Sequence, residues 1–133
     1  MQRKLPLLTP ENEPFWTGGK IGKLLIGHCA RCDRFFHPPS PLCARCGSTD
    51  VSPRPVSGRG RVISYTINHQ RWTPDLDVPY VVAIIGLEEE DDLRLVSNIV
   101  GCPPEDVFIG MAVRVTFENV EDVWIPLFEK DEA

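Results

Sequence analysis

Four of the five cysteines are spaced for a metal site. Cys29 and Cys32 form one Cys-x2-Cys pair, Cys43 and Cys46 form a second, and ten residues separate the pairs. Two residues between thiolates let one turn present both sulfurs to the same tetrahedral ion. Gly47 follows the second pair and can adopt the positive φ that points backbone N–H groups at sulfur. The spacing therefore predicts one structural zinc ion bound by all four thiolates.

Other uses of these cysteines fit the sequence less well. Two disulfides would suit a secreted domain, but the N-terminal residues lack the apolar region of a secretory signal. A catalytic zinc needs an open position for water, and four thiolates fill the tetrahedron. An iron site of the rubredoxin type has the same ligand geometry, so iron stays open as an alternative to zinc. His28 and His37 flank the cysteines, and we expect them to pack or to form hydrogen bonds.

The remaining reactive residues do not form a catalytic set. Cys102 stands alone in an acidic region, where a thiolate is disfavoured, so we predict a small buried residue there. His69 precedes Arg71 and Trp72 with no nucleophile or paired carboxylate beside it. We therefore predict that the chain is not an enzyme, and that His69 is a loop residue near a binding surface.

Turn and proline residues divide the chain into three sections. Residues 1–22 contain a short helix in which Asn12 is the expected N-cap, and Gly18-Gly19 should end it. Residues 23–51 hold the cysteines between strands expected at 23–28 and 34–37. A proline-rich stretch at 51–55 is then predicted to be a stiff connector.

The third section, residues 56–133, contains one strand pattern after another. Five strands are expected, with a short helical turn at 103–107 between the third and the fourth; the strands lie at 60–67, 80–87, 93–99, 112–117 and 123–128. This element order is that of an OB-fold barrel, with an SH3-like barrel as the main alternative. The predicted fold is mainly β: a short N-terminal helix, a rubredoxin-like zinc ribbon and a C-terminal five-stranded OB-fold barrel.

Composition and charge limit the classes of partner. A hydrophobic content of 42% and a charged content of 25% are those of a soluble globular protein, and we expect a cytoplasmic location. Residues 1–73 carry 11 Lys/Arg and 4 Asp/Glu, whereas residues 74–133 carry 3 Lys/Arg and 15 Asp/Glu. A small anion or a protein partner suits this division better than a long polyanion.

The order of these motifs resembles that of a known family. A helix with Phe15-Trp16 precedes the ribbon 29–47, Ser57–Val62 opens the barrel, and Ile109–Val113 precedes its fourth strand. This combination resembles the DUF35 family, also described as acyl-CoA-associated zinc ribbon plus OB-fold proteins, over about residues 10–128. The resemblance implies a non-catalytic subunit that binds a thiolase-fold enzyme acting on acyl-CoA, such as a thiolase, a retro-aldolase or a synthase. A MaoC-like enoyl-CoA hydratase is the alternative partner.

Two sets of residues are candidates for contact with such a complex. A basic set could face coenzyme A or an acidic partner surface: Arg54, Arg59, Arg61, His69, Arg71 and Trp72. Large apolar residues near the chain ends could contact the partner enzyme, with packing inside the monomer as the alternative: Phe15, Trp16, Trp124 and Phe128.

Two other functional classes fit the sequence less well. Zinc ribbons and OB-folds also occur in nucleic-acid-binding proteins, but the acidic barrel opposes a phosphate backbone. An independent CoA-dependent enzyme would need a nucleophile, base or cofactor motif that the sequence does not contain.

Overall fold

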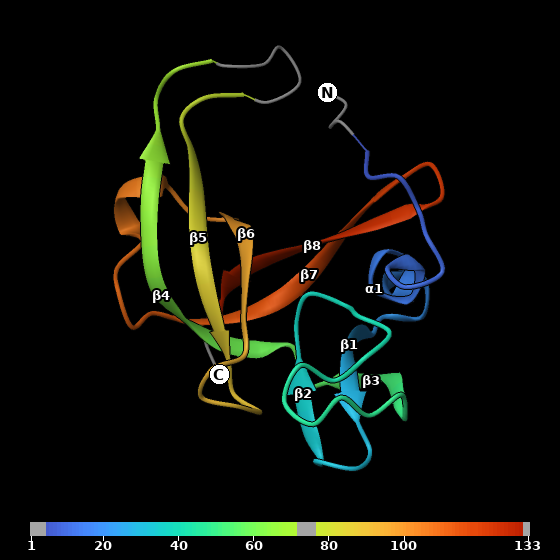
Figure 1. Cartoon of the computed structure of the whole chain (residues 1–133). Coiled ribbons are helices and arrows are strands. Elements are labelled where there is room, and N and C mark those ends of the chain that lie inside the picture. Colours follow the sequence, from blue (N-terminus) through green and yellow to red (C-terminus); the bar gives the residue numbers. More distant parts are fainter. Residues whose placement is uncertain (1–4, 72–76, 132–133) are drawn as a thin grey trace.

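The computed structural model describes residues 5–71 and 77–131, and it contains a closed barrel with a three-stranded sheet beside it (Figure 1). The chain is mainly β, as predicted, with one short α-helix before the cysteine region. Among the described residues, no helix combines the length and apolarity that a membrane crossing requires.

The small sheet holds the cysteine region. It consists of β1 (Leu24–Cys29), β2 (Arg34–Phe36) and β3 (Val51–Val56) in the order β2-β1-β3, and both pairings are antiparallel. The predicted connector at 51–55 is therefore wrong, since β3 pairs with β1 along its whole length. Its prolines are compatible with this pairing because β3 is an edge strand, where a missing N–H is tolerated.

The barrel is an OB-fold. Its strands are β4 Arg59–Asn68, β5 Tyr80–Leu87, β6 Arg94–Val100, β7 Ala112–Val120 and β8 Val123–Lys130. They close in the order β4-β5-β6-β8-β7, with β6 and β8 parallel and the other neighbours antiparallel. The short 3₁₀ helix η2 (Pro104–Asp106) lies between β6 and β7, where the sequence predicted a helical turn.

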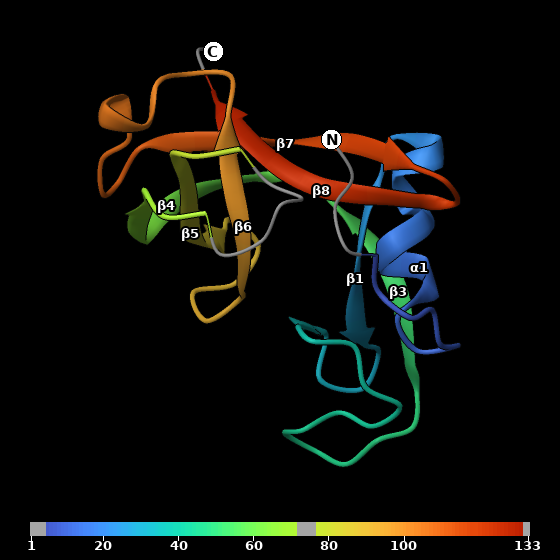
Figure 2. The same ribbon diagram turned by 90° about the horizontal axis from the view of Figure 1, so that it is seen from above.

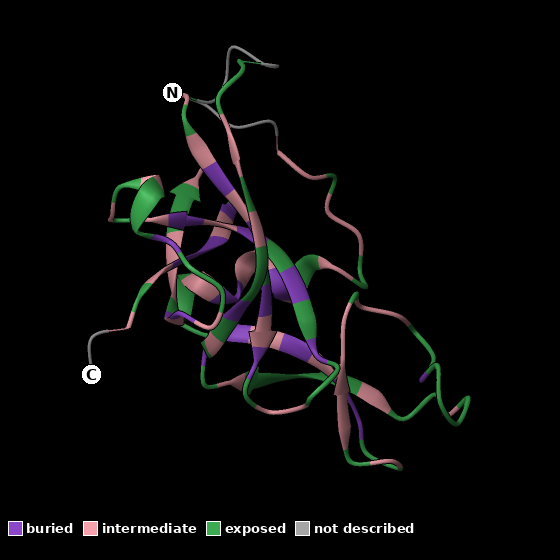
Figure 3. Ribbon diagram, turned by 90° about the vertical axis from the view of Figure 1, so that its left-hand side faces the viewer, coloured by how far each residue is buried: buried purple, intermediate pink, exposed green. Residues whose placement is uncertain are grey.

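Alternating side chains of the barrel strands form the core. Along β5 and β6 nearly every second residue is buried, as expected when one face of a strand lines a packed interior. The largest fully buried side chain is Phe128 of β8, with 0% of its surface exposed. Figure 3 shows buried residues following the barrel strands, while much of the cysteine region is exposed or intermediate.

The N-terminal helix ends where predicted but continues in another form. Helix α1 (Glu13–Thr17) has Gly18 as its C-cap, and a 3₁₀ helix, η1 (Gly18–Ile21), follows directly. Gly22 ends this second helix, at φ +72°. Asn12 occupies the N-cap position, as predicted, but its side chain does not cap the helix: its Oδ1 accepts a hydrogen bond from the Thr9 backbone N–H at 2.7 Å, which orders the preceding turn.

This helical segment ties the small sheet to the barrel. Helix α1 contacts β1 and β8, and η1 contacts β7 and β8 (Figure 2). The approach is close at Gly19, where an added Cβ would lie 2.5 Å from Trp124 Cβ and 2.6 Å from Phe117 Cδ1. Only a glycine allows this contact, which fixes the helix beside the β7–β8 hairpin.

Candidate metal centre

Two matched turns carry the four cysteines. After the first pair, the Asp33 N–H donates to the Cys29 carbonyl at 2.7 Å; after the second, the Gly47 N–H donates to the Cys43 carbonyl at 2.8 Å. Both turn residues have positive φ, +55° at Asp33 and +72° at Gly47. The sequence predicted this conformation for Gly47, and an aspartate tolerates it better than most residues do.

The sulfur atoms lie where a tetrahedral ion would need them. Cys29 Sγ is 3.7 Å from Cys46 Sγ, Cys32 Sγ is 3.9 Å from Cys43 Sγ, and all four lie within 4.8 Å of one another. Zinc–sulfur bonds of about 2.3 Å at tetrahedral angles place sulfurs about 3.8 Å apart. All four thiols are free, so the cysteines are positioned to bind one metal ion.

The backbone around the sulfurs favours thiolates. Backbone N–H groups of Cys46 and Arg45 lower the pKa of Cys43 to about 6. The Cys32 N–H also points at Cys29 Sγ, at 3.4 Å. Without an ion the cluster cannot hold four negative charges: hydrogen bonds to Cys46 and burial raise the pKa of Cys32 to about 12. The donor set therefore needs a cation, and it fits one of the zinc type.

The two flanking histidines do not reach the metal cluster. His28 is buried, and its Nε2 lies 3.0 Å from Asp33 Oδ1, which helps to hold the first cysteine turn. The His37 ring packs on Phe15 with centroids 4.9 Å apart, and burial lowers its pKa. The expectation that both pack or form hydrogen bonds is confirmed.

An acidic turn of the barrel forms hydrogen bonds and ion pairs with the cysteine region. We name residues 88–92, between β5 and β6, the docking turn. Asp92 accepts a hydrogen bond from Arg45 at 2.7 Å and one from Arg34 at 3.2 Å. Arg34 begins β2 just after the first cysteine turn, and Arg45 lies within the second. Glu90 lies 3.4 Å from Arg34 and also accepts the Phe35 backbone N–H at 3.1 Å. These contacts join the metal-binding turns directly to the barrel.

Substituting Asp92 by asparagine should loosen this docking. The hydrogen bond from Arg45 holds the pKa of Asp92 below its usual value. The Arg45–Asp92 contact therefore stabilises the fold fully above the unfolded pKa of about 3.9, and this stabilisation is lost as pH falls through the lower pKa of the folded state. Because the pair is exposed, we expect amide exchange at Phe35 to quicken only roughly twofold to fivefold at neutral pH. The neighbouring variant Asp91→Asn is the control, and equal exchange in all three proteins would contradict the role of Asp92.

The predicted basic set does not come together as one patch. Arg59 and Arg61 line a cavity of about 490 Å³ that also contains Glu88, Glu90 and Asp131. Arg54 lies on β3 of the small sheet, and Arg71, 3.6 Å from Asp77, follows the far end of β4. Ten residues of β4 span about 33 Å, which separates the two ends of the set. His69 is exposed beside Arg71, and Trp72 lies outside the described residues.

The predicted apolar contacts divide into core and surface residues. Phe128 is fully buried and Phe15 is 7% exposed, so both belong to the core of this chain. The prediction that Phe128 contacts a partner is therefore wrong. Trp16 packs partly against the core, with its ring 4.9 Å from that of Phe15, and Trp124 is half-buried. Only the two tryptophans keep surface that a partner could reach.

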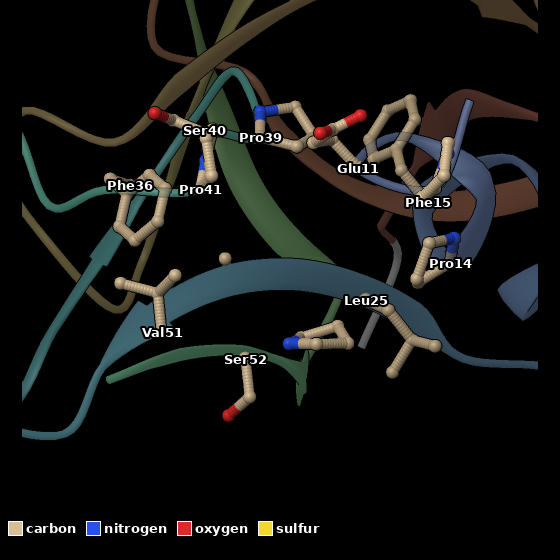
Figure 4. Close-up of a pocket in the computed structure, with 13 residues that line it drawn as sticks. Glu11, Pro14, Phe15, Leu25, Phe36, Pro39, Ser40, Pro41, Val51 and Ser52 are labelled. Carbon is tan, nitrogen blue, oxygen red and sulfur yellow. The ribbon is translucent and has the colours of Figure 1, made fainter. Parts of the chain in front are cut away.

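A second cavity lies between α1 and the small sheet. Figure 4 shows Phe15, Leu25 and Phe36 around it, with Pro39 and Pro41 from the loop between the cysteine pairs. Its volume is about 180 Å³, below the range of about 300–1,000 Å³ of typical ligand sites. We interpret it as imperfect packing between helix and ribbon.

Cys102 has no catalytic environment. It is partly buried against the core, and burial together with the nearby Asp106 carboxylate raises its pKa. A thiol of this kind is a poor nucleophile at neutral pH. Among the described residues, the four clustered cysteines are the one group that could hold a metal ion.

Comparisons with known proteins match both parts of the chain. Residues 16–52 match the family model of the rubredoxin-like zinc ribbon domain of ChsH2, and residues 53–118 match that of its C-terminal OB-fold domain. A DUF35 domain-containing scaffold protein of Methanocaldococcus jannaschii is 36% identical over 110 residues, covering 80% of this chain and 77% of the relative.

Two longer relatives are named as hydratase subunits. A "Probable enoyl-CoA hydratase alpha subunit" of Thermomonospora curvata is 35% identical over 95% of this chain, and the match covers 39% of that protein. The 3-oxo-4,17-pregnadiene-20-carboxyl-CoA hydratase alpha subunit of Mycobacterium tuberculosis is 35% identical over 89% of this chain and 37% of its own length. The chain thus spans well under half of these two relatives.

Solved structures show the same fold. A chain of the Ltp2-ChsH2(DUF35) aldolase superposes with a TM-score of 0.85 at 35% identity, covering 95% of this chain and 98% of that chain. A DUF35 protein of unknown function from Sulfolobus solfataricus has a TM-score of 0.62 at 22% identity over 92% of this chain and 86% of its own.

Proposed function

The chain belongs to the DUF35 family, and on that basis we propose that it is a non-catalytic zinc-binding subunit of an enzyme complex that acts on acyl-CoA. The observation that carries this proposal is the similarity, over almost the whole of both chains, to the DUF35 chain of an aldolase complex. The relatives named as scaffold proteins and as hydratase subunits support the same role.

The site chemistry supports a subunit without its own reaction. Four thiolates complete the coordination of one ion and leave no position for water or substrate. Cys102 has a raised pKa, and His69 is exposed, with no hydrogen bond or ion pair at its ring among the described residues. In this proposal the catalytic groups belong to the partner, and the metal supplies only rigidity to the ribbon.

We propose a thiolase-fold enzyme as the partner, of the thiolase, retro-aldolase or synthase type. The aldolase named in the matching structure favours this class. A MaoC-like hydratase is the second candidate, favoured by the two relatives named as hydratase alpha subunits. Because the chain covers less than two fifths of those relatives, the reaction of their remaining domains is not carried over with the match.

Co-purification tests the proposal. The tagged chain, expressed in its own cells with zinc, should retain one acyl-CoA enzyme in stoichiometric amount, identified by mass spectrometry. A thiolase-fold protein supports the first candidate, and a hydratase shifts the reaction class. Recovery of the chain alone, or turnover of acyl-CoA by the chain alone, would contradict the proposal.

Reversing two arginines tests whether the chain contacts coenzyme A itself. Coenzyme A carries about −4 in charge, which favours arginine partners, yet Arg59 and Arg61 share their cavity with several carboxylates. We expect Arg59→Glu with Arg61→Glu to weaken partner binding roughly tenfold through the lost surface charge. Calorimetry should show no coenzyme A binding to either protein in isolation. Unchanged affinity for the partner would remove these arginines from the interface, and coenzyme A binding to the wild type that the variant loses would assign them to coenzyme contact instead.

A further inference from the structure

The outer face of β4, β5 and β6 carries exposed aliphatic side chains. Ile63, Ile84 and Val96 are 39%, 37% and 68% exposed. Ile84 and Val96 are directly paired across β5 and β6. Ile63 lies over Gly86, which is two residues from Ile84 on β5. A Cβ atom added at Gly86 would be 2.9 Å from Ile63 Cδ1. The three side chains therefore form one surface, here called the sheet face.

A loop extends the sheet face beyond β4. The Gly110 N–H donates to the Val62 carbonyl at 2.8 Å, and the Val62 N–H donates to Met111 at 3.0 Å, which holds the loop against β4. The two residues before Gly110, Phe108 and Ile109, are 54% and 68% exposed. Single exposed apolar residues are ordinary, but a contiguous group indicates an interaction surface.

The strands of this face carry arginines but no acidic residue, and carboxylates of the docking turn and of Asp131 lie at one end of it, in the cavity that contains Arg61. Strands β4, β5 and β6 contain no aspartate or glutamate, although 15 such residues fall within 74–133. Arg61 on β4 and Arg94 on β6 are both cross-strand neighbours of Gly86, so two guanidinium groups border the aliphatic centre. Arg61 donates to the Gly110 carbonyl at 2.9 Å, and Arg94 is exposed.

Nothing in the described part of the chain covers this face. Strands β4, β5 and β6 form the side of the barrel away from α1 (Figures 1 and 2), and the cysteine region meets this side at the docking turn. In OB-folds the face of the second and third strands, here β5 and β6, is a usual ligand-binding face. Oligonucleotides need exposed aromatic rings to stack on, whereas the centre of this face is aliphatic. Small ligands need concave sites, and the cavity that Arg61, Ile63 and Gly86 help to line also contains Glu88, Glu90, Asp91 and Asp131, which disfavour an anionic ligand. Ile84 and Val96 lie outside that cavity, and an exposed aliphatic pair on a pleated surface suits a second protein.

We propose that the sheet face binds the partner enzyme, through an aliphatic patch on that enzyme bordered by carboxylates. This inference rests on the proposed function and assigns the surface that carries it. Aliphatic side chains would be removed from water at the centre, and the two arginines would meet the partner's carboxylates at the rim, where opposite charge sets orientation and association rate.

Val96→Glu tests the proposal, with Ile21→Glu as a matched control. Ile21 lies in η1, outside the sheet face, and is 66% exposed against 68% for Val96. The partner enzyme identified by co-purification is purified separately, and its affinity for each variant is measured by calorimetry. We expect Val96→Glu to weaken binding about thirtyfold, as for an interface hot spot, and Ile21→Glu to bind as the wild type does. Circular dichroism and zinc content confirm that each variant is folded.

A second variant tests the rim. Arg94→Glu leaves the aliphatic centre intact and should weaken binding at low salt, with a smaller effect at high salt. Equal affinity of the wild type, Val96→Glu and Arg94→Glu for the enzyme would overturn the inference and leave the proposed function standing. Failure of the wild type to retain any acyl-CoA enzyme would overturn both. A wild-type dimer in ultracentrifugation that Val96→Glu separates would assign the face to self-association and overturn the inference.

Discussion

Replacing Cys29 by serine should unfold the zinc ribbon while leaving the barrel closed. Cys29 is fully buried, begins the first cysteine turn and ends β1, so its loss removes a metal ligand at the end of the central strand of the small sheet. Structural zinc contributes about 10–16 kcal/mol of apparent binding free energy at neutral pH, and a ribbon of this size has little core of its own. We expect less than one bound zinc per chain and loss of amide protection in β1 and β3.

The fifth cysteine provides the matched control for this substitution. Cys102 lies outside the metal cluster, so Cys102→Ser should keep one zinc and the protection of β1. Amides of β5 should stay protected in both variants, since the barrel core does not include the cysteine turns. Wild-type zinc content in Cys29→Ser would show that the four-thiolate site is wrong.

Replacing Phe128 by alanine should destabilise the barrel by about 3–5 kcal/mol, the usual result for a large aromatic residue in a packed core. Phe128 is 0% exposed and pairs with Val115 of β7 and Ile99 of β6, so its removal leaves a cavity where three strands meet. Since small domains are stable by about 5–15 kcal/mol, this is a large fraction of the total. The free energy of unfolding in urea, with zinc in excess, is the measurement.

The comparison with Trp124→Ala separates packing from partner contact. Trp124 is half-buried on the same strand, so its loss should cost less stability. Were Phe128→Ala to fold as stably as the wild type and yet lose the partner enzyme, Phe128 would be an interface residue and the core described above would be wrong.

Local patterns predicted the metal site well because its determinants are local. The spacing of each cysteine pair and the residue after it decide the turn, and the structure shows positive φ at Gly47, as predicted, and also at Asp33. The strand order and the position of η2 also follow from alternation and proline content. These features require no information about distant residues.

Features that depend on distant residues were not predicted. Nothing in the local sequence connects Arg45 to Asp92, 47 positions away, so the sequence does not predict the docking turn. The prolines of β3 resembled a connector because edge pairing with β1 is a tertiary property. The basic set was expected to cluster, but the length of β4 separates Arg61 from Arg71.

Native mass spectrometry of the wild-type chain, made in zinc-replete cells, tests the central claim most directly. Ribbon and barrel form one platform only if four sulfurs hold one ion between them. We expect a mass with one zinc per chain, and loss of amide protection in β1 when a chelator removes the zinc. Metal-free protein with four free thiols, or with the cysteines joined as disulfides, would contradict it.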